Sequence, residues 1–279
     1  MIQDIFPSKL KNEFIHTSIS DGDSLFFFDA DGKVLLGSSG GTVLFPAGSD
    51  RENRETIYLF SLDERKFFLA FGHDAVQKDG FRYYGIREVR DYLEGKEVFA
   101  VFTAYHLWKW YSDHVFCGKC AEKLIPDEKE RALRCPACGN VIYPRINPAV
   151  IIGVIKGDFL LITRYRTGYS RNALIAGFTE IGETLEETVA REVMEETGIK
   201  VRNIRYYKSQ PWGMAQDLLV GFYCDADGDD PIKMDEQELK YAAWVPREEI
   251  ELQPNNLSLT NEMMRMFKEG LEPRDGVAS

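Results

Sequence analysis

The chain has 279 residues, of which 44% are hydrophobic and 28% charged, proportions typical of a globular protein with one or two domains. Its net charge of −11 argues against a protein that binds nucleic acid through many phosphates, because such binding requires clustered Lys and Arg. A small anionic substrate held locally by metal ions stays compatible with that charge.

The start of the chain and its hydropathy predict a cytoplasmic protein. Residues 1–11 contain Asp4, Lys9 and Lys11 and no apolar run, so they lack the pattern of a secretory signal. No segment is apolar over a length that would span a membrane. In such a chain, closely spaced cysteines are expected to bind metal before they form disulfides.

Residues 1–111 are predicted to form an α+β domain. Apolar runs at residues 25–28 and 34–36 flank Asp31-Gly32, a sequence that favours a β-hairpin. No catalytic constellation is visible here, so a structural or substrate-covering role is expected. Further predicted strands lie at 42–45, 57–60 and 67–71, and predicted helices at 86–93 and 98–111.

Residues 112–145 contain two Cys-x-x-Cys pairs, which predict a zinc ribbon. Cys117 and Cys120 are followed, after fourteen residues, by Cys135 and Cys138. Thiolates suit tetrahedral zinc, and the spacing allows a hairpin to return the second pair to the first. Four cysteines leave no open coordination position, so we expect one structural Zn²⁺ per chain.

Residues 146–279 are predicted to form a compact α/β domain, because strand and helix patterns alternate along them. Cys224 lies in an apolar run and is expected to be a buried strand residue. The last residues, 272–279, are expected to be disordered. The predicted strands are 149–155, 159–164, 204–209 and 218–224, and a late helix is predicted at 259–268.

An acidic helix lies inside this last domain. Thr184 followed by Glu187 forms a capping box, and Gly198 is a good terminator, so a helix is predicted from Leu185 to Thr197. At about 100° per residue, three glutamates fall within an arc of about 100° on one face. They are Glu192, Glu195 and Glu196.

Three carboxylates on one helix face repel one another unless a cation lies between them. Mg²⁺ and Mn²⁺ prefer carboxylate oxygens, and a diphosphate can supply further ligands to the same ions. A solvated acidic surface is the alternative interpretation. It leaves the spaced glycines, Arg191 and the preceding loop unexplained.

The stretch from Gly177 to Ile199 resembles the Nudix box, Gly-x₅-Glu-x₇-Arg-Glu-apolar-x-Glu-Glu-x-Gly-apolar, at every fixed position. The resemblance implies a Nudix α/β/α sandwich that hydrolyses a nucleoside diphosphate linked to another group. It implies that Glu192 and Glu196 bind metal and that Glu195 is a ligand or base. Glu183 would organise the loop, and Arg191 would position the glutamates.

The zinc ribbon and Ser209-Gln210-Pro211-Trp212 are similar to features of the NADH pyrophosphatase subfamily. That subfamily's motif continues Pro-Phe-Pro-x-Ser, whereas this chain has Gly213-Met214-Ala215 and ends in Asp217. The resemblance implies a dinucleotide substrate, a homodimer and, in some members, removal of NAD caps from RNA. The alternative interpretation of Trp212 is that it only packs in the core and does not contact substrate.

Further roles follow from the same resemblance. Phe178 and Tyr143 would stack on a base, the Tyr coming from the partner subunit. Gln210, Pro211, Trp212 and Glu130 would contact substrate. Ala176, through its carbonyl, and Glu238 would add ligands to catalytic Mg²⁺ or Mn²⁺.

Three functions therefore stay open at the level of sequence. The first is hydrolysis of NAD(H) to AMP and nicotinamide mononucleotide. The second, favoured by the altered motif, is hydrolysis of ADP-ribose or other ADP-linked compounds. The third is a nucleotide sensor without catalysis, and the complete set of helix glutamates counts against it.

Overall fold

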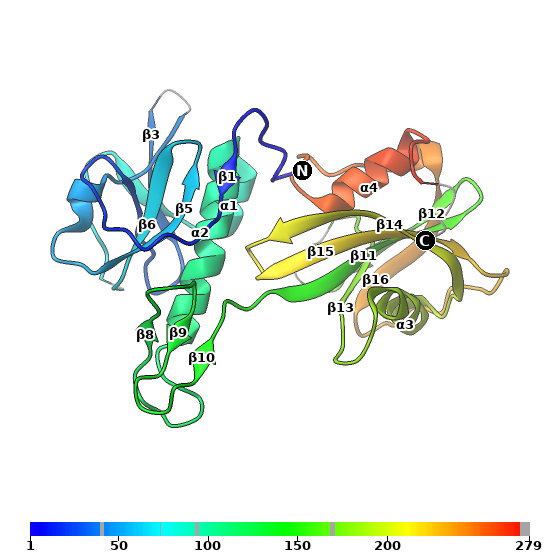
Figure 1. The fold of residues 1–279 in the computed structure, drawn as a ribbon. Helices are drawn as coiled ribbons and strands as arrows, with labels where there is room; N and C mark the ends of the chain where they lie inside the picture. Colours follow the sequence, from blue (N-terminus) through cyan, green and yellow to red (C-terminus); the bar gives the residue numbers. More distant parts are fainter. Residues whose placement is uncertain (40–41, 73, 93–94, 168–170, 274–279) are drawn as a thin grey trace. The chain divides into compact units, whose positions relative to one another are not determined.

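The computed structural model describes residues 1–279 except 40–41, 73, 93–94, 168–170 and 274–279 (Figure 1). The chain divides into two compact units. The first unit contains residues 3–145 and 213–216, and the second contains residues 1–2, 146–212 and 217–279. The amino-terminal and cysteine-rich segments therefore cluster together, and their division into separate domains stays a prediction.

The first unit has the predicted α+β character. One sheet has the strand order β1-β5-β6-β2 and another the order β4-β3-β7. Aromatic rings fill the core: Phe28 stacks on Trp108 of α2 with ring centroids 4.9 Å apart. The elements are β1 (Leu10–Lys11), β2 (Ser24–Phe26), β3 (Val34–Ser39), β4 (Thr42–Leu44), η1 (Gly48–Arg51), β5 (Thr56–Leu62), β6 (Arg65–Ala70), β7 (Phe81–Tyr84), α1 (Ile86–Tyr92) and α2 (Lys96–Asp113).

The hairpin predicted around Asp31-Gly32 was only partly right. Gly32 makes the turn with φ +78°, and Phe28 bridges Val34. However, β2 pairs in parallel with β6, whereas β3 pairs with β4 and β7. The two predicted strands therefore belong to different sheets.

The cysteine-rich segment forms a small antiparallel sheet, with β9 between β8 and β10. These strands are short, as expected where a metal rather than an apolar core organises the fold. Their bounds are β8 (Ile125–Pro126), β9 (Leu133–Arg134) and β10 (Val141–Ile142).

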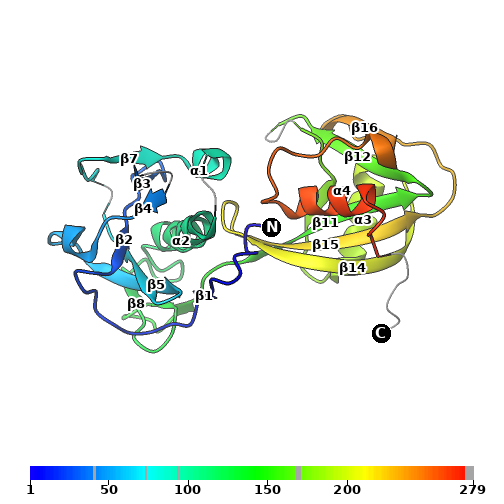
Figure 2. The same ribbon diagram turned by 90° about the horizontal axis from the view of Figure 1, so that it is seen from above.

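The second unit is built on one mixed sheet with the order β14-β15-β11-β12-β16, and β13 also pairs with β11 (Figure 2). β11 and β15 run parallel in continuous register at the centre. The strands are β11 (Asn147–Lys156), β12 (Phe159–Tyr165), β13 (Ile175–Phe178), β14 (Val201–Trp212), β15 (Asp217–Ala226) and β16 (Leu239–Pro246).

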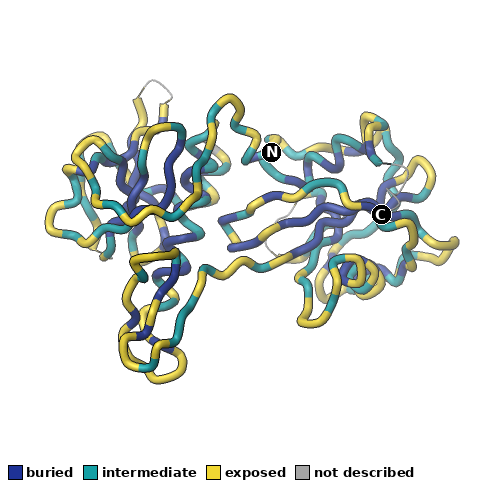
Figure 3. Tube along the Cα trace, in the orientation of Figure 1, coloured by how far each residue is buried: buried dark blue, intermediate teal, exposed yellow. Residues whose placement is uncertain are grey.

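Helices cover both faces of this sheet, which confirms the predicted sandwich. Alternate residues of β11 point to opposite faces. Val150 and Ile152 pack with Val189 and Val193 of α3 (Leu185–Thr197). Ile151 and its odd-numbered neighbours pack with α4 (Leu259–Lys268). Most residues of the central strands β11 and β15 are buried (Figure 3).

Several expected elements have the predicted bounds, and others differ. α3 and α4 begin and end at the predicted residues, and Cys224 is fully buried on β15. β14 extends to Trp212, so the Ser-Gln-Pro-Trp segment is strand. β13 and β16 were not predicted; β13 has only four residues, and six of the eight residues of β16 are partly exposed. The prediction of a disordered tail was wrong for Glu272, which is buried and ion-paired with Arg247. Residues 274–279 of that predicted tail lie outside the described residues.

Among the described helices, none is long and apolar enough to cross a membrane.

Candidate active site and zinc site

Local sequence fixes where α3 begins and ends. The Thr184 hydroxyl accepts a hydrogen bond from the Glu187 amide at 3.2 Å, and the Glu187 carboxylate accepts one from the Thr184 amide at 2.8 Å. Gly198 ends the helix in the left-handed conformation with φ +68°. The predicted capping box and C-cap are both confirmed, and they set the rotation of the acidic face.

Gly177 lets β13 approach that face closely. A Cβ built on Gly177 would lie 1.9 Å from the Glu192 side-chain carbon Cδ. Any other residue there would displace this carboxylate, because real atoms cannot approach so closely. The first glycine of the box therefore makes room for a glutamate fifteen residues later in the chain.

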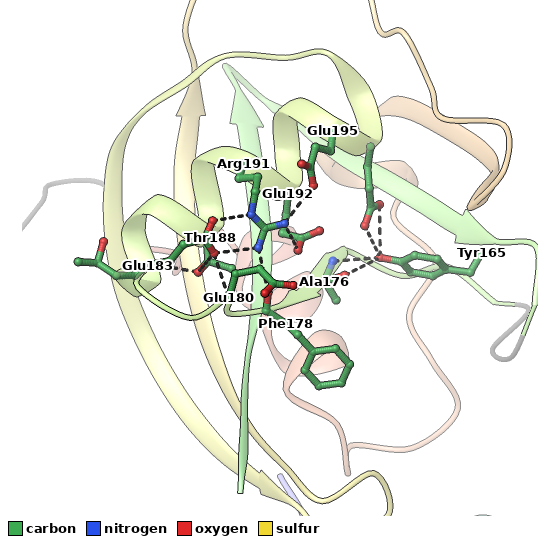
Figure 4. A network of polar contacts seen from close by, with 11 residues as sticks. Tyr165, Ala176, Phe178, Glu180, Glu183, Thr188, Arg191, Glu192 and Glu195 are labelled. Atoms are coloured by element: carbon green, nitrogen blue, oxygen red, sulfur yellow. Dashed lines mark hydrogen bonds and ion pairs between the residues drawn. The ribbon is translucent and has the colours of Figure 1, made fainter.

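Arg191 lies at the centre of a polar network above α3 (Figure 4). Its guanidinium donates to Glu183 through two nitrogens, to Glu192 at 2.6 Å and to Glu195 at 3.0 Å. It also donates to the Phe178 carbonyl at 2.9 Å. Bonding to Arg191 lowers the pKa of Glu183 to about 2. A fixed cation thus ties the loop, β13 and the helix into one unit.

The predicted metal-binding glutamates differ greatly in exposure. The Glu196 residue is 2% exposed and the Glu192 side chain 12%, whereas the Glu195 side chain is 60% exposed. Burial, reinforced by negative charges at Glu238, Glu192 and Asp235, raises the pKa of Glu196 to about 8. Burial also raises the pKa of Glu192. Buried carboxylates that repel one another either stay protonated or are held ionised by a compensating cation.

Glu238 lies just before β16 and acts electrostatically on both buried acids. The Arg166 amide, at the end of β12, donates to the Glu238 carbonyl at 2.9 Å and so holds this segment beside β12. Ala176 lies on β13 beside Gly177 and pairs with Ile151. The predicted oxygen donors thus come from three separate elements at one end of the sheet.

These residues fit a hard divalent cation. Their donors are carboxylate and carbonyl oxygens, two of the acids are buried, and Gly177 opens the space that Glu192 occupies. In the part of the chain that is described, only the cysteines bring three or more ligand atoms within 4.8 Å of one another.

The four predicted zinc ligands are brought together by two similar turns. Cys117 and Cys135 each accept a backbone hydrogen bond four residues on, from Ala121 at 2.8 Å and Gly139 at 3.0 Å. Both donor residues have positive φ, +62° and +72°. The same geometry at both pairs points four side chains toward one centre.

The sulfur atoms have the spacing of a tetrahedral site. Sγ of Cys117 lies 3.7 Å from that of Cys138, and Sγ of Cys120 lies 3.4 Å from that of Cys135. Zn–S bonds of about 2.3 Å imply S–S separations of about 3.8 Å. None of the described cysteines is in a disulfide. A hydrogen bond from the Lys119 amide lowers the pKa of Cys117 to about 6, which favours the thiolate.

Two predicted substrate residues of the first unit contact each other. The Tyr143 hydroxyl donates to the Glu130 carboxylate at 2.9 Å, and the Tyr143 ring is 56% exposed. In the second unit Phe178 is 55% exposed, although its carbonyl is held by Arg191. Exposed aromatic faces of this kind are available for stacking.

The Ser-Gln-Pro-Trp segment has a different character. Gln210 is fully buried, donating to the Leu257 carbonyl at 2.7 Å and accepting from the Leu259 amide at 2.7 Å. Trp212 packs partly against the α4 core, and Pro211 is exposed. Gln210 thus anchors the start of α4, so any effect it has on substrate would pass through that segment.

Comparisons with known proteins agree with this geometry. Residues 145–267 match the NUDIX domain, and residues 112–143 match the NADH pyrophosphatase zinc ribbon domain. The region that matches the zinc ribbon domain therefore lies directly before the region that matches the NUDIX domain. Proteins described as NAD-capped RNA hydrolase NudC from Escherichia coli (strain K12 / DH10B), Shigella flexneri and Citrobacter koseri are each 42% identical over 151 residues. Each alignment covers 53% of this chain, and the chain spans 58% of the relative's length.

Among solved structures, a NUDIX hydrolase from Nitrosomonas europaea is 19% identical, with a TM-score of 0.48. The match covers 58% of this chain and 94% of that chain.

Sequence reasoning missed one residue that contacts a predicted metal-binding glutamate. Tyr165, at the end of β12, lies with its hydroxyl against Glu196 and Ala176 (Figure 4). No motif marks it, because it is thirty-one residues from Glu196 and only the sheet brings the two together.

The first unit has a cavity of about 330 Å³ that includes none of the predicted site residues. It lies between the segment Phe14–Thr17, the start of β5 and residues 126–128 of the zinc ribbon.

Proposed function

We propose that the protein hydrolyses the diphosphate bond of NAD or NADH, giving AMP and the nicotinamide mononucleotide. The observation that carries the proposal is the convergence of buried Glu192 and Glu196 with Glu195 and Glu238 beside an Arg191-organised loop. The zinc ribbon and the relatives described as NAD-capped RNA hydrolases support a dinucleotide substrate.

The surroundings of each residue indicate its proposed role. Bound Mg²⁺ or Mn²⁺ would neutralise phosphate oxygens and supply an activated water. Glu192, Glu196 and the Ala176 carbonyl would hold the ions, with Glu238 completing the donors. Glu195, more exposed, would act as a further ligand or as the base that accepts the proton from water.

The reaction is a simple addition of water. A water oxygen forms a new bond to one phosphorus, and the bond from that same phosphorus to the bridging oxygen breaks. The other phosphate leaves with the bridging oxygen, and the two protons of the water are shared between the products and solvent. Arg191 contributes by holding the acids in place, since its donors are already used by Glu183, Glu192 and Glu195.

Substrate orientation would come from aromatic stacking. We propose that Phe178 stacks on a base, with Tyr143 of the partner subunit on the other side in a homodimer. Glu130 would position that Tyr through its hydrogen bond. The homodimer, the cytoplasmic location and the choice of metal stay predictions.

A second candidate is hydrolysis of ADP-ribose or related ADP-linked compounds. It is favoured by Gly213-Met214-Ala215, which replace the Pro-Phe-Pro that the NADH pyrophosphatase motif has after Trp212. NAD-capped RNA is an extension of the first candidate, since the relatives are described by that substrate.

The deciding experiment compares NADH, NAD, ADP-ribose and NAD-capped RNA side by side, with Mg²⁺ and with Mn²⁺, and identifies the products. AMP and nicotinamide mononucleotide from NAD(H) support the proposal. Ribose 5-phosphate from ADP-ribose, with NAD(H) unchanged, supports the second candidate. Tight nucleotide binding without any product contradicts both and favours a sensor.

A further inference from the structure

The Tyr165 hydroxyl lies where the buried acid meets β13. Its oxygen is 3.2 Å and 3.4 Å from the two carboxylate oxygens of Glu196. It is also 3.0 Å from the Ala176 amide nitrogen and 3.5 Å from the Ala176 carbonyl oxygen. One hydroxyl therefore touches two residues that the proposed function assigns to divalent-ion binding.

The geometry decides how this hydroxyl is used. The Ala176 amide can only donate, so the Tyr165 oxygen accepts there. A phenol has a single proton to give, and the remaining neighbours are Glu196 at 3.2 Å and the carbonyls of Leu174 and Ala176 at 3.5 Å. The carboxylate is the nearest acceptor and, when ionised, the strongest.

Glu196 depends on this contact. Its carboxylate accepts no other hydrogen bond from the residues that the structure describes. Glu192, by contrast, is held by Arg191 at 2.6 Å. The two buried acids thus have separate supports, one on the helix itself and one on β12.

The sheet aims Tyr165 at this position. Arg164 pairs with Tyr241 and Tyr165 with Leu239, so β16 has one extra residue at the end of β12. Such a bulge bends β16, the strand that carries it, and increases the local twist of the β12–β16 pair where Tyr165 lies. The next amide, from Arg166, holds the Glu238 carbonyl at 2.9 Å. The end of β12 is therefore joined to Glu196, Ala176 and Glu238.

We propose that Tyr165 is a positioning residue, which holds the Glu196 carboxylate and the Ala176 backbone in the arrangement that divalent-ion binding requires. This inference rests on the proposed function, because that function gives these two residues their role as ligands. Residues that orient metal ligands commonly change metal affinity or activity about 10- to 100-fold when they are lost.

The test is Tyr165→Phe, which removes the hydroxyl and keeps the ring. Tyr223→Phe is the matched control, since Tyr223 is also buried in the Nudix domain and donates to the Met263 carbonyl at 2.7 Å, on the α4 side of the sheet. Mn²⁺ binding to each full-length protein, with zinc retained and no substrate, is measured by electron paramagnetic resonance. Thermal melting of each variant is recorded in parallel.

We expect Tyr165→Phe to weaken Mn²⁺ binding about 10- to 100-fold, with turnover partly recovered at saturating Mn²⁺. Tyr223→Phe should bind Mn²⁺ as the wild type does, even where it melts at a lower temperature. Wild-type Mn²⁺ affinity in Tyr165→Phe, or equal weakening in both variants, overturns the inference. Weakened binding in Tyr165→Phe alone, in a protein that hydrolyses none of the dinucleotides, overturns only the proposed function.

Discussion

Arg191 donates two parallel hydrogen bonds to Glu183, from Nε to Oε1 at 2.6 Å and from Nη2 to Oε2 at 2.9 Å. A planar guanidinium can form this pair while its third nitrogen still reaches Glu192. A lysine ammonium in the same place is a single point charge and cannot span these partners.

Arg191→Lys should therefore lower kcat/KM by about 10- to 100-fold, with charge preserved. Arg202→Lys is the control, because its ion pair with Asp227 lies on the surface of the same domain, with both side chains more than half exposed. Steady-state kinetics on the best substrate measure both variants. Equal activity of the two would show that the Arg191 fork is not needed to hold the glutamates.

Glu196→Gln should lower turnover by at least ~10²-fold, comparable to loss of a key electrostatic group in other enzymes. The change keeps the size of the side chain and removes one anionic ligand. Glu186→Gln, on the exposed first turn of the same helix, should keep wild-type turnover. A folded Glu196→Gln protein with wild-type turnover would show that the acidic face of the helix takes no part in catalysis.

The raised pKa of Glu196 also predicts how stability depends on pH. Its pKa is about 8 in the fold, against an ordinary value of 4.5. Between these values the folded protein binds the proton more tightly than the unfolded chain, so stability falls as pH rises from about 4.5 to about 8. Glu196→Gln should flatten this fall.

Urea unfolding at a series of pH values, with zinc retained and no added Mg²⁺ or Mn²⁺, measures the effect. Glu195→Gln is the control, since that side chain is 60% exposed. The prediction fails when Glu196→Gln and wild type lose stability in parallel over this range.

The zinc ribbon should hold about one zinc per chain in a site with four sulfur ligands. Cys117→Ser should lose the metal and lower the melting temperature, because the ribbon strands have two residues each and little core of their own. Cys224→Ser, in the buried β15 strand, should keep the zinc. Metal analysis that finds no zinc in the wild type would contradict the assignment.

Phe178→Ala should raise KM for dinucleotides, because the variant lacks the exposed ring that would stack on a base at the edge of the site. Phe159→Ala removes a ring of similar exposure, 43%, from the start of β12 and serves as control. Substrate titrations of both variants decide the point. Unchanged KM in Phe178→Ala would remove the stacking role.

Local sequence determined the parts of this protein whose structure depends on neighbours along the chain. Thr184, Glu187 and Gly198 fixed α3, and the helix period placed Glu192 and Glu196 on one face. The Cys-x-x-Cys spacing predicted four converging sulfurs, which the two matching turns bring together.

Only the tertiary structure decided what lies between distant segments. It buried Glu196 against Tyr165, used the Gln210 amide to hold the start of α4, and sent the two halves of the Asp31-Gly32 hairpin to different sheets. Such contacts depend on which strands pair and which side chains become buried when the whole domain folds. The spacing of residues along one element indicates neither the pairing of strands nor the burial of a side chain by a distant segment.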